Sequence, residues 1–97
     1  MLHTVNKSPF KNSALDECAR FATPGSPILL IEDGVYAAKA GTGYEAKLKE
    51  IMSGNEVYAL EPDIKARSIN ALVDGVKVVG YDGFVDLVET HKTHSWL

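Results

Sequence analysis

The stretch at residues 27–31, with the sequence PILLI, constrains the fold more than any other part of the chain. A strand with one face in water alternates apolar and polar residues. This run is apolar throughout, so a strand built from it must be covered on both faces. Because parallel sheets placed between helices meet that requirement, the run predicts a mainly parallel sheet with a helical layer on each side.

Three other short runs, rich in β-branched residues or leucine, have the length and composition of strands: residues 2–5, 56–60 and 76–79. Helical patterns follow the four runs at 13–21, at 35–52 with a break at 41–43, at 62–67 and at 84–91. Since strands alternate with helices, we expect a small three-layer α/β/α sandwich whose mainly parallel sheet has four to five strands.

Size and charge exclude several classes of protein. A chain of 97 residues closes one core, so residues 1–97 are expected to form one domain. The formal net charge is -3 and the cations are scattered, which argues against direct binding of nucleic acid. The one cysteine cannot form an intramolecular disulfide, and neither a signal-peptide pattern nor a membrane-spanning run is present. We therefore expect a cytoplasmic protein without a membrane partner.

The carboxyl ends of the predicted strands, where α/β folds place their sites, are mostly acidic. Phosphate groups of a nucleotide or flavin would be repelled there, and no glycine-rich phosphate turn is present, so no cofactor is expected. Glu32, Asp33 and Asp63 could instead hold Mg²⁺, as in a receiver-like binding module. A receiver, however, needs its acidic pair after the first strand, where this chain has Asn6 and Lys7.

Cys18 lies near the middle of the apolar arc of the helix predicted at 13–21. Free cysteine is among the most buried residue types, so packing is the simplest role for it. Asp16 and Glu17 are its sequence neighbours, and their charges would oppose formation of a thiolate. The local sequence thus favours packing but leaves sulfur chemistry open.

The three histidines and the tryptophan have weaker signals. His91 and His94 are three residues apart, but two histidines without a third ligand indicate a metal only weakly. A histidine that stabilises the carbonyl groups at a helix end is the better interpretation. His3 is expected in the core or at an interface, and Trp96 either folds back over its own core or contacts a partner.

Several segments together resemble one family. They are LHTVNKSPF, CARFATPG, ILLIEDGVYAAKAGT, VYALEPDIKAR, YDGFVDLVE and the final WL. From end to end, this set is similar to the DsrH/TusB family of sulfur-relay subunits. Ser68 departs from the pattern, because the resemblance leads us to expect glycine there, and residues 49–56 follow no family pattern.

The resemblance implies a DsrEFH-like, flavodoxin-like topology and a subunit of a cytoplasmic heterohexamer. The partners it implies are DsrE/TusD-like and DsrF/TusC-like subunits and a DsrC/TusE-like carrier protein that receives persulfide sulfur. The chain would then be an accessory or sulfur-carrying subunit of a sulfurtransferase complex, not a stand-alone enzyme.

Within the family, the DsrH branch serves dissimilatory sulfur oxidation and the TusB branch serves 2-thiouridine synthesis in tRNA. The main sulfur-accepting cysteine belongs to the DsrE/TusD-type subunit, but the DsrH branch keeps a cysteine in the first helix, where this chain has Cys18. The resemblance therefore favours the DsrH branch and makes Cys18 a candidate persulfide carrier. Such a thiolate needs exposure and a nearby cation, which Lys7 or a partner could supply, so we expect the sulfur at the core's edge, facing the first loop. Lys7 and Trp96 are the candidate partner contacts.

Overall fold

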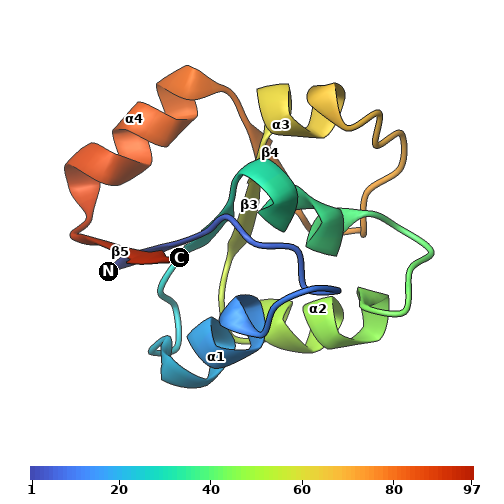
Figure 1. The fold of residues 1–97 in the computed structure, drawn as a ribbon. Helices are drawn as coiled ribbons and strands as arrows, with labels where there is room; N and C mark the ends of the chain where they lie inside the picture. Colours follow the sequence, from blue (N-terminus) through green and yellow to red (C-terminus); the bar gives the residue numbers. More distant parts are fainter.

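The computed structural model describes residues 1–97 and contains one five-stranded sheet, which confirms the predicted class of fold (Figure 1). Its strands are β1 (Leu2–Val5), β2 (Ile28–Leu30), β3 (Val57–Leu60), β4 (Lys77–Val79) and β5 (Thr93–Trp96). Every neighbouring pair is parallel. Strand β5 has the sequence THSW, which carries no apolar run, and this is why the apolar runs alone identify only four strands.

The strand order is β4-β3-β2-β1-β5. The first three crossovers step in one direction across the sheet, and the last returns to the far side of β1. The flavodoxin-like order is 2-1-3-4-5, in which the chain reverses direction after the first crossover. In this sheet the reversal comes at the last crossover, so the strand order differs from the flavodoxin-like one. Right-handed crossovers that run in opposite directions place their helices on opposite faces. The last helix is therefore separated from the others by the sheet.

The helical elements are α1 (Ala14–Phe21), the 3₁₀ helix η1 (Glu32–Ala38), α2 (Glu45–Met52), α3 (Glu61–Ala66) and α4 (Tyr81–Thr90). The break predicted at 41–43 is present, because η1 and α2 are separate elements and Gly41 has a φ of 83°. Ser13 precedes α1 but makes no side-chain cap; instead, Asn12 Oδ1 accepts a hydrogen bond from the Ala14 N–H at 2.7 Å. None of the helices combines the length and the apolar character needed to cross a membrane.

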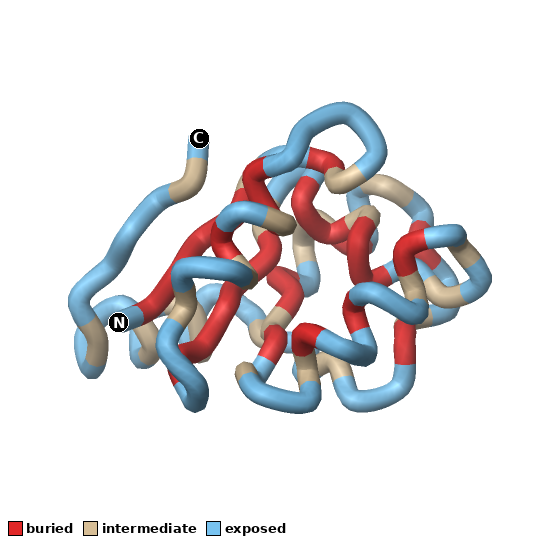
Figure 2. Tube along the Cα trace, turned by 90° about the horizontal axis from the view of Figure 1, so that it is seen from below, coloured by how far each residue is buried: buried red, intermediate tan, exposed pale blue.

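The larger core lies on one face of the sheet. Successive side chains of a strand point to opposite faces, and Val5, Leu30 and Ala59 share the face covered by α1, η1 and α2. Leu29 and Leu60 are also buried but lie on the other face. Figure 1 shows α4 on that side, away from α1 and α2. Figure 2 shows the buried residues concentrated in the centre of the molecule and the C-terminal segment at its surface.

Two glycines allow helices to approach the sheet closely. A Cβ on Gly34 would lie 2.2 Å from the carbonyl oxygen of Val5, so η1 can pass the end of β1 only with glycine there. A Cβ on Gly83 would lie 3.0 Å from the Cβ of Val79, which shows how closely α4 packs on β4. The continuously apolar β2 between these two layers confirms the prediction from PILLI.

Candidate functional site

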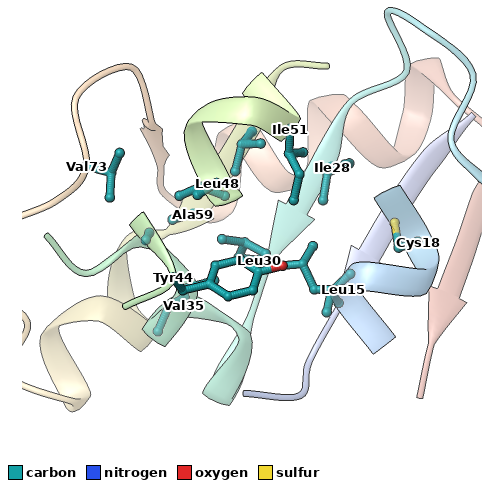
Figure 3. Close-up of a cluster of buried hydrophobic side chains, with 14 of the residues drawn as sticks. Leu15, Cys18, Ile28, Leu30, Val35, Tyr44, Leu48, Ile51, Ala59 and Val73 are labelled. Atoms are coloured by element: carbon teal, nitrogen blue, oxygen red, sulfur yellow. The ribbon is translucent and has the colours of Figure 1, made fainter. Parts of the chain in front are cut away.

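Cys18 lies inside the core of the chain. Ala14, Leu15 and Cys18 are the buried residues of α1, which confirms the centre of the predicted apolar arc, but Phe21, which also belongs to that arc, is 74% exposed. Figure 3 shows the Cys18 side chain on α1 at the margin of the labelled core residues, beyond Leu15, and its exposed fraction is 0%. The exposure that a persulfide carrier needs is therefore absent in this chain by itself, because the side chain is completely buried.

The environment of Cys18 disfavours the thiolate. Burial raises the pKa of the thiol to about 12, because the charged form loses its hydration. Lys7 is exposed after the end of β1 and makes no hydrogen bond or ion pair, so the predicted cation does not act on Cys18 here. Because the thiolate is the attacking form in sulfur transfer, a persulfide on Cys18 would require α1 to open or a partner to change its surroundings.

A polar contact fastens α1 to the following helical segment. The Tyr44 hydroxyl donates a 2.7 Å hydrogen bond to Asp16 Oδ1, and Lys47 Nζ lies 3.7 Å from the same oxygen. Burial and the Asp16 carboxylate both raise the pKa of Tyr44. A shallow cleft of about 450 Å³ lies beside this contact, and Cys18 is not among its lining residues: Ser13, Asp16, Ala19, Arg20, Lys47, Glu50, Ile51, Ser53, Gly54 and Asn55. The cleft therefore provides no route to the sulfur.

Two acidic residues at the carboxyl ends of β2 and β3, Asp33 and Asp63, are paired with Arg67. Arg67 Nε donates to Asp33 Oδ1 at 2.9 Å, and Arg67 Nη1 lies 3.8 Å from Asp63 Oδ1. The second oxygen of Asp63 accepts the Glu32 N–H at 2.7 Å. No three side chains of His, Cys, Asp or Glu in the chain are arranged to hold a metal ion. These contacts argue against the receiver-like Mg²⁺ module.

Four rings gather where β5 meets β1 and α1. We call His3, Phe21, His94 and Trp96 the aromatic edge cluster. Trp96 Nε1–H donates to His3 Nδ1 at 3.1 Å, and its ring centroid lies 5.8 Å from that of Phe21 and 4.7 Å from that of His94. Trp96 thus folds back onto its own chain while it stays half-buried, and Phe21 is 74% exposed. The cluster is both part of the packing and part of the surface.

The two C-terminal histidines have separate places. His91 follows α4, and its Nδ1 lies 3.1 Å from the Leu87 carbonyl oxygen, as expected for a histidine at a helix end. His94 belongs to β5 and contacts Trp96 instead. The sequence reasoning missed Phe21 as a surface residue. The place of His94 and Trp96 in the cluster had a weak signal in the sequence: residues two apart share one face of a strand. The segment is too short and too polar to be recognised as a strand from that pattern.

Comparisons with known proteins decide the family. The family described as DsrH like protein matches residues 7–94 of the chain. The chain belongs to the DsrH-like family. Protein TusB of Photorhabdus laumondii is 38% identical over 98 residues, covering 99% of this chain and 100% of that protein. Protein TusB of Serratia proteamaculans is 35% identical over 99 residues, with the same coverage. The fold of the ychN protein from E. coli is similar, with a TM-score of 0.77, 18% identity, and coverage of 95% and 94%.

The names of these relatives correct one expectation. The cysteine in α1 favours the DsrH branch, but full-length relatives of this DsrH-like chain carry the name TusB. Identity spread over the whole chain carries more weight than one residue, since a buried cysteine is retained for packing as readily as for chemistry. The comparisons therefore favour the TusB branch.

Proposed function

We propose that this DsrH-like chain is a TusB-like subunit of a cytoplasmic, hetero-oligomeric sulfur relay for tRNA 2-thiouridine synthesis. The observation that supports it is the 38% identity to Protein TusB of Photorhabdus laumondii, which extends over both chains almost completely. In this proposal the partners are TusC-like and TusD-like subunits, and the complex delivers persulfide sulfur to a TusE-like carrier protein.

Within this relay we assign the chain a structural and docking role. The buried thiol of Cys18, with its pKa raised to about 12, supports a packing function in the free subunit. Sulfur would then be accepted on another subunit. The aromatic edge cluster is the candidate contact nearest the C-terminus, because Trp96 and the exposed Phe21 belong to residue types enriched at binding hot spots or interface cores. Lys7 is a second candidate, as an exposed cation with no partner within the chain.

The test is a complementation experiment in a bacterium whose own gene for this subunit has been deleted. Wild-type chain should restore 2-thiouridine in tRNA, measured by mass spectrometry of nucleosides, and should co-purify with the TusC-like and TusD-like subunits. Cys18→Ala should restore it to the same level, because the thiol is not needed in a docking role. The proposal would be refuted if the wild-type chain did not co-purify with these subunits and if 2-thiouridine stayed at the level of the deletion strain.

A further inference from the structure

Helix α4 differs from α1, α2 and α3 in having no buried residue. Its partly covered residues, Gly83, Phe84 and Leu87, fall on the side that packs on the sheet. Tyr81, Val85 and Val88 remain 62%, 49% and 41% exposed. At spacings of four and three residues they lie along one side of the helix, and we call them the α4 apolar stripe. Apolar side chains aligned in this way on a rigid helix indicate a contact surface.

A row of carboxylates borders the stripe. Asp82, Asp86 and Glu89 have the same spacing of four and three residues, and helical geometry places them on the side of the stripe opposite the sheet. We call them the α4 acidic row. None of the three forms an ion pair within the chain: the ion pairs use Asp16, Glu45, Glu61, Asp33, Asp63 and Glu56. The helix contains no lysine or arginine, so the row presents uncompensated negative charge.

Glu89 is badly placed for the helix itself. It lies in the last turn of α4, where the macrodipole is negative and a cation would be favourable. No basic residue in that turn offsets it. Glu89 thus weakens its own helix and has no ion-pair partner within the chain. Such a local conflict is expected where the charge serves a contact with another molecule.

We propose that the α4 apolar stripe and acidic row form the docking surface for one of the other subunits of the relay, and that this subunit presents an apolar patch edged with lysine or arginine. The inference rests on the proposed function. Charge disfavours a second copy of this chain as the occupant, since two α4 helices packed antiparallel through their stripes would bring two acidic rows together. A partner with the opposite charge at its rim makes the same surface attractive.

The experiment measures binding of the purified full-length chain to the purified TusC-like and TusD-like subunits at 50 and 500 mM salt. Glu89→Lys should weaken binding by about 10-fold at low salt and by much less at high salt, because salt screens exposed charges. The same substitution should leave the melting temperature unchanged or raise it, since lysine suits the end of α4. Loss of binding with gain of stability separates docking from folding.

The matched control is Glu50→Lys, the same charge change at an exposed position of α2, which should leave binding unchanged. Val85→Ser with Val88→Ser should weaken binding at both salt concentrations, because an apolar contact is not screened. Full binding by the α4 variants would overturn the inference and leave the proposed function intact. Self-association of the free chain that the serine variant abolishes would also overturn it. If wild-type chain binds neither subunit, the proposed function itself fails.

Discussion

At the scale of single residues, the burial of Cys18 determines its chemistry. The sulfur is enclosed, its pKa is raised to about 12 by burial, and no cation compensates. The thiolate fraction at neutral pH is therefore very small, and a thiol reagent in solution cannot reach the sulfur unless α1 opens.

We accordingly expect the Cys18 thiol of the folded chain to react with a disulfide reagent at pH 8 at least about 100-fold more slowly than in denaturant. The rate is measured by absorbance of the released thiol. Equal rates would show that the thiol is accessible. A faster rate in the assembled complex than in the free chain would revive the persulfide-carrier role, which Cys18→Ser in a persulfide-transfer assay would then test.

The second residue-scale prediction concerns His3. Its pKa is lowered from the ordinary value of 6.5 by burial and by the charges of His94 and the N-terminus. Because the unfolded chain binds the proton first, stability is complete above about pH 6.5 and is lost as pH falls toward the lower pKa of the folded state. Protonation of Nδ1 also removes the acceptor for Trp96 Nε1–H.

Trp96 is the only tryptophan, so its fluorescence reports on this contact directly. We expect the emission of Trp96 to change between pH 7 and pH 5 together with a fall in melting temperature, and His3→Gln to remove both effects. His91→Gln is the matched control, because His91 lies outside the aromatic edge cluster. A titration that persists unchanged in His3→Gln would contradict the assignment.

At the scale of elements, the end of α3 explains why glycine is expected at position 68, where this chain has serine. The Ser68 N–H donates to the Lys65 carbonyl at 3.1 Å and the Ile69 N–H donates to the Ile64 carbonyl at 3.2 Å. This is the Schellman arrangement, in which the residue at Ser68 takes a left-handed conformation, here with φ of 52°. Glycine adopts that conformation without the strain of a Cβ.

Ser68→Gly should therefore stabilise the protein by about 1 kcal/mol, because removal of the strain exceeds the added entropy of the unfolded chain. Thermal or urea unfolding measures the change. Ser53→Gly is the control: Ser53 ends α2 with φ of -68°, so glycine there should destabilise by about 0.5–1 kcal/mol. Destabilisation by both substitutions would contradict the account of Ser68.

At the scale of the whole molecule, β5 closes the sheet on the far side of β1. Its residues pair with Leu2 to Val5, and Thr4 Oγ1 donates to Ser95 Oγ at 3.1 Å across the two ends of the chain. Without β5, the buried β1 would become an edge strand with an unpaired backbone.

Removal of residues 92–97 should lower the melting temperature by more than 10 °C, as expected for about 2 kcal/mol or more in a domain of this size, or abolish cooperative unfolding. Circular dichroism follows the change. Trp96→Ala, which keeps the strand and removes the ring, should give a smaller decrease and keeps the test informative if the shortened chain fails to fold. A shortened chain that melts like the full-length protein would show that β5 contributes nothing.

Much of the fold could be predicted from local patterns. PILLI required cover on both faces, and the apolar arc of residues 13–21 predicted which side of α1 is buried. The end of the predicted helix at 84–91 and the role of His91 also followed from local chemistry. The candidate site was less accessible to sequence reasoning. The burial of Cys18 depends on strands that are distant in sequence, and pairing of Asp33 and Asp63 with Arg67 depends on how η1 and α3 meet.

Local patterns in the sequence were enough to predict an α/β sheet and the buried central strand β2, because hydrophobic patterning acts over a few residues. That THSW forms a strand became apparent only in the folded chain, because its hydrogen bonds are made to β1 at the other end of the sequence. Only the tertiary structure decided that α4 lies alone on one face and leaves its stripe and acidic row exposed, since the direction of a crossover is a property of the whole sheet.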